Sequence, residues 1–184
     1  MKLTVTGVDD SPPVVDGAVA YTVVLGAASS ADPSYNGLNP ADVAMTNADN
    51  DVAGVVITQS GGTTAVAEAG PTSDTYTIRL STRPLANVVI AVGTADGETV
   101  ASPTSLTFTP SGWNTAQTVT ITAIDDPDIE GAHTGSVTHG LSSADGVYNG
   151  LAVPGVTASL SDNDSAAYAI SAASLVLAEA AGSG

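Results

Sequence analysis

An acidic cluster follows one of the strand-like segments of this sequence. Asp125, Asp126, Asp128 and Glu130 lie within six positions, directly after the alternating run 117–124. Carboxylates this close repel one another unless a cation lies among them. The chain has three lysine and arginine residues against nineteen aspartate and glutamate residues, so protein cations can pair with few of these acids. A bound metal ion is therefore the leading candidate for the partner.

The strongly negative net charge limits the kinds of molecule that the protein can bind. A formal net charge of −16 argues against binding to nucleic acid or to an anionic membrane surface. No apolar run is long enough for a membrane helix, so membrane insertion is not expected. Hydrophobic residues make up 43% of the chain, which argues against a disordered acidic tail. The lack of cysteine suits an extracellular protein on a bacterial cell surface.

Hydrophobic alternation predicts an all-β fold. Apolar residues alternate with threonine and serine, the period-2 pattern of a sheet that is solvated on one face, in the segments 3–8, 19–25, 76–80, 88–92, 106–108 and 119–123. Turn signals such as Asn36-Gly37 and Asn149-Gly150 separate the segments. The alanine-rich stretch 166–181 also alternates, which favours strands over a helix. We expect antiparallel β-sandwiches of the immunoglobulin-like kind.

An internal repeat organises the chain. The matching segments are 5–10 with 121–126, 35–38 with 148–151, 49–51 with 162–164, and 67–69 with 178–180. They predict the C-terminal half of a first repeat at 1–51, a complete repeat at 52–164, and the N-terminal strands of a third at 165–184. A half repeat exposes an unfinished core, so we expect an excerpt of a longer tandem array.

The acids of the complete repeat recur at several strand ends. Alternate loops of a sandwich lie at the same end of the domain, so these segments are placed to converge. Together they offer more oxygen atoms than the six to eight that one Ca²⁺ takes. Carboxylate ligands without cysteine or histidine favour calcium over zinc or copper.

The order of these motifs resembles the Calx-β repeat, the calcium-binding sandwich of sodium–calcium exchangers and of many large bacterial surface or adhesin-type proteins. The residues that carry the resemblance are 67–70, 75–80, Pro84, 105–108, 119–126, Glu130 and 161–164. The resemblance spans about 52–164 and returns in both partial repeats.

The resemblance implies a set of calcium ligands. They are Glu68, Asp96, Asp125 or Asp126, Asp128, Glu130, Asp162 and Asp164. Two departures from the family pattern bear on this set. Asn163 replaces an acid, which lowers the charge of the site, and in the first repeat Asp16 takes the place of Glu130 after a Pro12-Pro13 pair. We expect the first site to be weaker or altered.

Other interpretations of single residues are structural. Aspartates at strand ends are often plain solvated turns, and we assign Asp74 and Asp145 to that class. His133 and His139 are expected to be packed or edge residues rather than metal ligands. Trp113 is expected to anchor a loop. Residues 49–51 lack the glycine and the final glutamate of an EF-hand.

These observations favour a mechanical function. No motif of a nucleophile with its base is present, so we expect no enzymatic activity. We expect a calcium-rigidified stalk, adhesin segment, or filament or surface-layer segment. Its partners would be neighbouring repeats and identical subunits. The alternative is a ligand-binding or carbohydrate-binding accessory module of a secreted protein, although aromatic residues form only 4% of the chain.

Overall fold

β-strands make up nearly all the regular structure of the computed structural model, which describes residues 2–168. The strands are β1 (Val19–Val23), β2 (Val43–Asn47), β3 (Val55–Gln59), β4 (Thr64–Ala67), β5 (Ser73–Leu80), β6 (Val88–Thr94), β7 (Thr99–Ser102), β8 (Ser105–Phe108), β9 (Gln117–Ala123), β10 (His133–Ser143) and β11 (Val156–Ser161). One 3₁₀ turn, η1 (Ser60–Gly62), follows β3. Within the described range, no helix has the length and apolarity to span a bilayer. The all-β prediction is confirmed.

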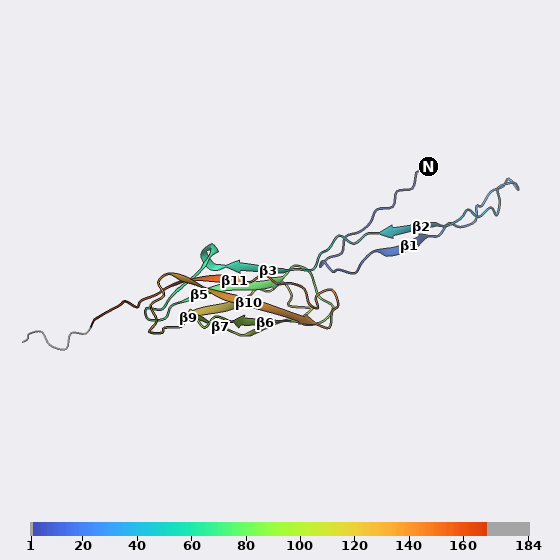
Figure 1. Ribbon diagram of the computed structural model, residues 1–184. Helices are drawn as coiled ribbons and strands as arrows, with labels where there is room; N and C mark the ends of the chain where they lie inside the picture. Colours follow the sequence, from blue (N-terminus) through green and yellow to red (C-terminus); the bar gives the residue numbers. More distant parts are fainter. Residues whose placement is uncertain (1, 169–184) are drawn as a thin grey trace, which may run out of the picture.

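Nine of these strands form a two-layer sandwich (Figure 1). One sheet has the order β4-β11-β10-β6-β8 and the other the order β3-β5-β9-β7. The described pairs within each sheet are antiparallel, except that β4 pairs with β11 in parallel. This exception arises because η1 carries the chain from one sheet to the other. Gly61 and Gly62 have φ of 60° and 88°, backbone angles that residues with a Cβ atom rarely adopt.

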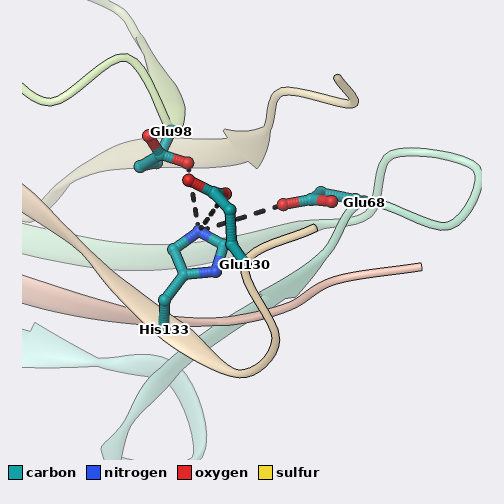
Figure 2. Close-up of side chains that lie close together, drawn as sticks. All are labelled: Glu68, Glu98, Glu130 and His133. Carbon is teal, nitrogen blue, oxygen red and sulfur yellow. Dashed lines mark hydrogen bonds and ion pairs between the residues drawn. The ribbon is translucent and has the colours of Figure 1, made fainter. Parts of the chain in front are cut away.

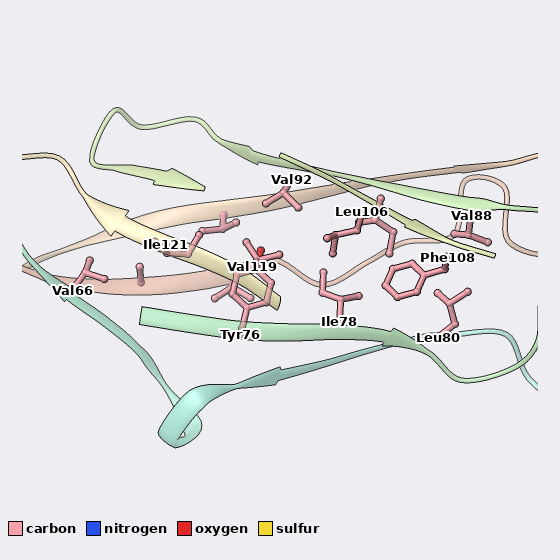
Figure 3. Packing of buried hydrophobic residues seen from close by; sticks show 14 of the residues in the cluster. Val66, Tyr76, Ile78, Leu80, Val88, Val92, Leu106, Phe108, Val119 and Ile121 are labelled. Carbon is pink, nitrogen blue, oxygen red and sulfur yellow. The ribbon is translucent and has the colours of Figure 1, made fainter. Parts of the chain in front are cut away.

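The core lies between the two sheets and follows the alternation of the sequence. On β5 the buried residues Tyr76, Ile78 and Leu80 alternate with more exposed neighbours, and β11 shows the same period. Figure 3 shows the β5 side chains facing the opposite sheet, where Val88 and Phe108 are fully buried. Burying one such side chain contributes about 1.5–3 kcal/mol. This packed frame holds the loops at each end of the sandwich.

A buried tyrosine joins two loops at one end of the sandwich. Tyr148 is 1% exposed, and its hydroxyl donates to the Thr82 carbonyl oxygen at 2.7 Å and lies 2.8 Å from Thr82 Oγ1. Beside it, Asp145 is 8% exposed and accepts hydrogen bonds from the amides of Leu85 and Val147. The prediction that Asp145 lies in a solvated turn is therefore wrong.

The prediction for Asp74 is wrong for a similar reason. Asp74 lies within β5, where its carboxylate accepts hydrogen bonds from the amides of Ala65, at 2.9 Å, and Thr75, at 2.6 Å. These bonds, with a further one from the Ser60 hydroxyl, tie η1 and β4 to β5. The Asp74 and Asp145 carboxylates thus accept hydrogen bonds from backbone amides that have no carbonyl partner in the sheets.

Residues 2–51 contain the β1–β2 hairpin and a turn that matches the Tyr148 turn bond for bond. Tyr35 and Asn36 donate backbone hydrogen bonds to Asp32, as Tyr148 and Asn149 do to Asp145. Tyr35 is nevertheless 61% exposed. The division at 1–51, 52–164 and 165–184 stays a prediction, and residues 169–184 of the expected third repeat lie outside the described residues.

The strand predicted at 3–8 is absent from the described structure. The matching segment of the complete repeat belongs to β9, which pairs with β5 on one side and β7 on the other. Residues 3–8 have no such neighbours among the described strands, and their described side-chain contact is a hydrogen bond from Asn47 to the Val8 carbonyl oxygen. Strand propensity alone therefore does not make a strand where the pairing partners are lacking.

Candidate metal centre

Loops from both sheets bring acidic side chains together at one end of the sandwich. Glu68 follows β4 and Glu98 precedes β7. Glu130 lies before β10, His133 is its first residue, and Asp162 and Asp164 follow β11. Two compact groups result, each with ligand atoms within 4.8 Å of one another: Glu68 with Glu98, Glu130 and His133, and Glu68 with Asp162 and Asp164. Glu68 belongs to both groups.

The Glu68 carboxylate is buried without a hydrogen-bond donor. The residue is 1% exposed, and neither Oε1 nor Oε2 has a hydrogen-bond partner. Its backbone amide donates to the Ser161 carbonyl oxygen at 3.1 Å, which fixes its position beside β11. Burial, followed by the charge of Asp162, raises the pKa of Glu68 above its ordinary 4.5. A buried charge of this kind is destabilising unless a cation or a donor meets it.

Asp162 connects two loops of the site. Its Oδ2 accepts hydrogen bonds from the amides of Glu130, at 2.8 Å, and Gly131, at 2.6 Å, while Oδ1 accepts one from Asp164 at 2.6 Å. The bond from Asp164, and next the bond from Gly131, lower the pKa of Asp162. These amide donors favour the ionised form of Asp162, which holds the 125–131 loop against the end of β11.

Asp164 supplies a third unsatisfied carboxylate oxygen, after the two of Glu68. Its Oδ2 is buried and has no hydrogen-bond partner. Burial raises the pKa of Asp164, and the charges of Asp162 and Asp125 raise it further. Asp164 and Glu68 thus place unpaired carboxylate oxygens close to each other and to Asp162, an arrangement that a cation would stabilise.

Asp125, Asp126 and Asp128 form the outer part of the acidic region. Asp125 Oδ1 accepts a hydrogen bond from the Asn163 side chain at 3.2 Å, and Asp126 Oδ1 accepts one from the Asp128 amide at 2.9 Å. They lie outside the two compact groups of the described residues, but their charges contribute to the raised pKa of Asp164. Their assignment as ligands stays a prediction.

The turn between β6 and β7 directs two acids to different places. Asp96 Oδ2 accepts a hydrogen bond from the Ser136 amide of β10, whereas Glu98 Oε2 lies 3.0 Å from His133 Nε2. Gly97, with φ of 93°, reverses the chain between them. Sequence reasoning assigned the ligand role to Asp96, and the structure brings Glu98 to the compact group. The acidic Asp-Gly-Glu turn was the available signal, but it did not say which acid faces the site.

His133 lies among three glutamates, although it was expected to be a packed or edge residue. Its Nε2 lies 3.0 Å from Glu98, 3.5 Å from Glu130 and 3.9 Å from Glu68 (Figure 2). The hydrogen bond with the Gly131 carbonyl, and then the contact with Glu98, raise the pKa of His133.

The packing prediction does hold for His139. Its ring contacts Tyr76 edge-on, with Nε2 2.8 Å from the tyrosine hydroxyl, and burial lowers its pKa. The two histidines of the chain therefore differ in role: one packs in the sandwich, and the other lies in the acidic region.

A related acidic group lies in residues 2–51, the predicted first repeat. Asp9, Asp10 and Asp51 come within 4.8 Å, and Asp49 accepts the amides of Asp16, Gly17 and Asp51, as Asp162 does in the complete repeat. One contact differs. The Val14 amide donates to Asp51 Oδ2 at 3.1 Å and to Asp10 Oδ2 at 2.8 Å. The residue that follows the inserted Pro12-Pro13 pair thus donates a hydrogen bond to Asp51. The matching residue Asp164 has no such donor for its Oδ2.

Comparison with known proteins gives similarity to solved β-sandwiches only. No family model matches the sequence, and a search of curated proteins finds no match. The apo-form Calx CBD1 domain is 23% identical over 60% of this chain and 98% of that one, with a TM-score of 0.39. The calcium-binding domain CBD12 of CALX1.1 is 24% identical over 59% of this chain and 45% of that one, at 0.38. The D00-D0 domain of intimin is 19% identical over 70% and 59%, at 0.36.

We expect the metal-free protein to melt at a lower temperature as pH rises above about 6.5 and through the raised pKa of His133. The His133 pKa is raised in the folded state, so its imidazolium contributes stability below the ordinary 6.5, and this is lost as pH rises through the folded value. Glu68, Glu130 and Asp164 have raised pKa values and act in the same direction at lower pH. Calorimetry in a chelator measures the effect.

The control separates His133 from the general repulsion of an acidic chain. His133→Gln should flatten the pH dependence in this window. His139→Gln should leave it in place, because the lowered pKa of His139 makes its own contribution fall with decreasing pH, below 6.5. A wild-type melting temperature that is constant or rises with pH would contradict the assignment.

Proposed function

We propose that this chain is a calcium-binding structural segment of an extracellular tandem array, in which calcium stiffens each repeat and its joints. The observation that carries this proposal is the Glu68 carboxylate, buried and without a donor next to Asp162 and Asp164. Such a group is stable in the folded protein only when protonated or next to a cation. The surroundings are acidic, and His133, 3.9 Å from Glu68 Oε1, is one positive charge at most among several carboxylates, which favours a further cation from outside the chain.

Calcium fits the Asp162 side of the site best. The three carboxylates there offer oxygen ligands only, which is the chemistry that Ca²⁺ prefers. Asp125, Asp126 and Asp128 lie close enough to influence the pKa of Asp164, and they supply further oxygens toward the six to eight that calcium takes. Asp162 already orders the backbone between the two acidic loops.

The joint between the first and second repeats contains a continuous series of hydrogen bonds. Asp51 and Asp10 both accept the Val14 amide, and the neighbouring Pro13 carbonyl oxygen accepts the Arg83 amide of the sandwich at 2.8 Å. A cation bound by Asp9, Asp10 and Asp51 would neutralise these carboxylates, which otherwise repel one another across the loop. The loop would then transmit the position of one repeat to the next.

The proposed role is mechanical and needs no catalysis. Neighbouring repeats and identical subunits are the proposed partners, at a bacterial cell surface or in a filament. Trp113 packs against the sandwich core, and its carbonyl oxygen accepts the Leu80 amide, which agrees with a loop anchor. No observation of the described residues favours the carbohydrate-binding alternative, and we do not propose it.

Small-angle scattering tests the mechanical role on a longer chain that carries two complete repeats. With calcium, the maximum dimension should increase and the spread of interdomain distances should narrow, because the neutralised joint holds one angle. The measurement is repeated in a chelator at matched ionic strength. Equal dimensions in both conditions, with calcium bound by titration calorimetry, would reduce the metal to a local clamp and reject the array role.

A further inference from the structure

Four side chains from three loops surround one point beside the proposed calcium group. They are Glu68, Glu98, Glu130 and His133, and each offers a ligand atom within 4.8 Å of the others. The distances from His133 Nε2 to the carboxylate oxygens are 3.0 Å for Glu98, 3.5 Å for Glu130 and 3.9 Å for Glu68. Figure 2 shows the three carboxylates around this nitrogen. Ligands at about 2.0–2.2 Å from a tetrahedral zinc ion lie roughly 3.3 Å apart. The Glu98 and Glu130 oxygens lie near that spacing from Nε2, and the Glu68 oxygen lies about half an ångström farther away.

The backbone prepares His133 to act as a ligand. Its Nδ1 lies 2.9 Å from the Gly131 carbonyl oxygen, which can only accept a hydrogen bond. The Nδ1 proton therefore stays in this hydrogen bond, and a metal ion would take the place of the proton that Nε2 shares with Glu98 in the metal-free protein. A backbone carbonyl on one ring nitrogen and a metal on the other is the usual arrangement of histidine ligands. Gly131, with φ of 70°, permits the turn that places this carbonyl.

Glu68 supplies an independent sign that a cation belongs here. It is 1% exposed, both of its oxygens lack hydrogen-bond partners, and it faces the His133 ring. Glu98 and Glu130 are partly exposed, at 19% and 34%, and leave a route by which an ion can enter. A buried end and an open end together form a site rather than a patch of surface acid.

We propose that Glu68, Glu98, Glu130 and His133 bind a first-row divalent metal ion such as Zn²⁺, separately from calcium but with Glu68 shared between the two. Calcium takes oxygen ligands, whereas imidazole nitrogen suits zinc and its neighbours. The nitrogen at the centre of this group therefore selects a different ion from the all-oxygen group at Asp162. This site goes beyond the proposed array function and does not depend on it.

Cobalt is the probe, because Co²⁺ resembles Zn²⁺ in its ligands and its visible absorption reports coordination geometry. The full chain, stripped with a chelator, is titrated with Co²⁺ in saturating calcium. We expect one visible band from four- or five-coordinate cobalt, which zinc abolishes by displacement because zinc binds more tightly. His133→Gln should weaken cobalt binding by more than about tenfold. His139→Gln, the matched change at the packed histidine, should leave it unchanged.

A second measurement needs no variant. In nitrogen-15 spectra of labelled histidine, zinc should shift Nε2 of His133 and leave His139 as it was. Cobalt binding that is the same in the His133→Gln protein, or zinc that shifts neither histidine, overturns the proposal. If the full chain binds cobalt at His133 but does not bind calcium, the calcium function is rejected and the proposed transition-metal site remains.

Discussion

Replacing Glu68 with glutamine should raise the melting temperature of the metal-free protein and remove most of the increase that calcium produces. Glutamine has nearly the shape of glutamate but carries no charge. The variant therefore loses a carboxylate that is buried, has no donor and has a raised pKa. The same change removes a central ligand of the acidic site. One substitution should thus act with opposite signs in the two conditions.

Calorimetry of the full chain in chelator and in calcium measures both effects. A ligand that binds only the folded state adds about 2.7 kcal/mol at a hundredfold excess over its Kd. In wild-type protein this corresponds to an increase of several degrees, and in Glu68→Gln most of that increase should be missing. Asp42→Asn is the control with an equal change of charge, at an exposed residue outside the acidic groups, and it should retain the wild-type calcium response because the asparagine oxygen can still accept the Leu25 amide. If Glu68→Gln destabilised the metal-free protein and kept the calcium response, the assignment of Glu68 as a calcium ligand would be wrong.

Tyr148→Ala should destabilise the sandwich by about 3–5 kcal/mol, the range for removing a large buried aromatic side chain. Tyr148 is 1% exposed, and its hydroxyl contacts the carbonyl oxygen and Oγ1 of Thr82. Tyr148→Phe keeps the ring and should cost about 1–3 kcal/mol, because buried groups of Thr82 lose their partner. Urea unfolding gives both values.

Tyr35→Ala is the matched control for this prediction. Tyr35 begins the same Tyr-Asn-Gly-Leu sequence and lies in a turn with the same backbone bonds, but it is 61% exposed. Its removal should change the free energy of unfolding by about 0.5 kcal/mol or less. Equal losses at the two tyrosines would mean that Tyr35 is covered in solution and that the first repeat is not an open half.

The sheets could be predicted well from the residues because burial on one face imposes a period of two. The segments expected at 76–80 and 119–123 lie inside β5 and β9, and each begins with apolar residues that face the core. The segment 3–8 has the same pattern and forms no strand, because the backbone partners that β9 finds in β5 and β7 are not available to it. Local pattern sets the face of a strand, and pairing decides whether the strand exists.

At the candidate metal centre, the sequence by itself determined that acids would gather at strand ends at one end of a sandwich. The resemblance to the Calx-β repeat implied Glu68, Glu130, Asp162 and Asp164 as ligands, and the structure brings these residues close together, while their role as ligands stays a prediction. Only the tertiary structure decided that Asp96 faces β10 while Glu98 faces the site, and that His133 stands among the glutamates. The physical reason is that side-chain direction at a loop depends on single φ values, as at Gly97 and Gly131, and on neighbours far away in the chain.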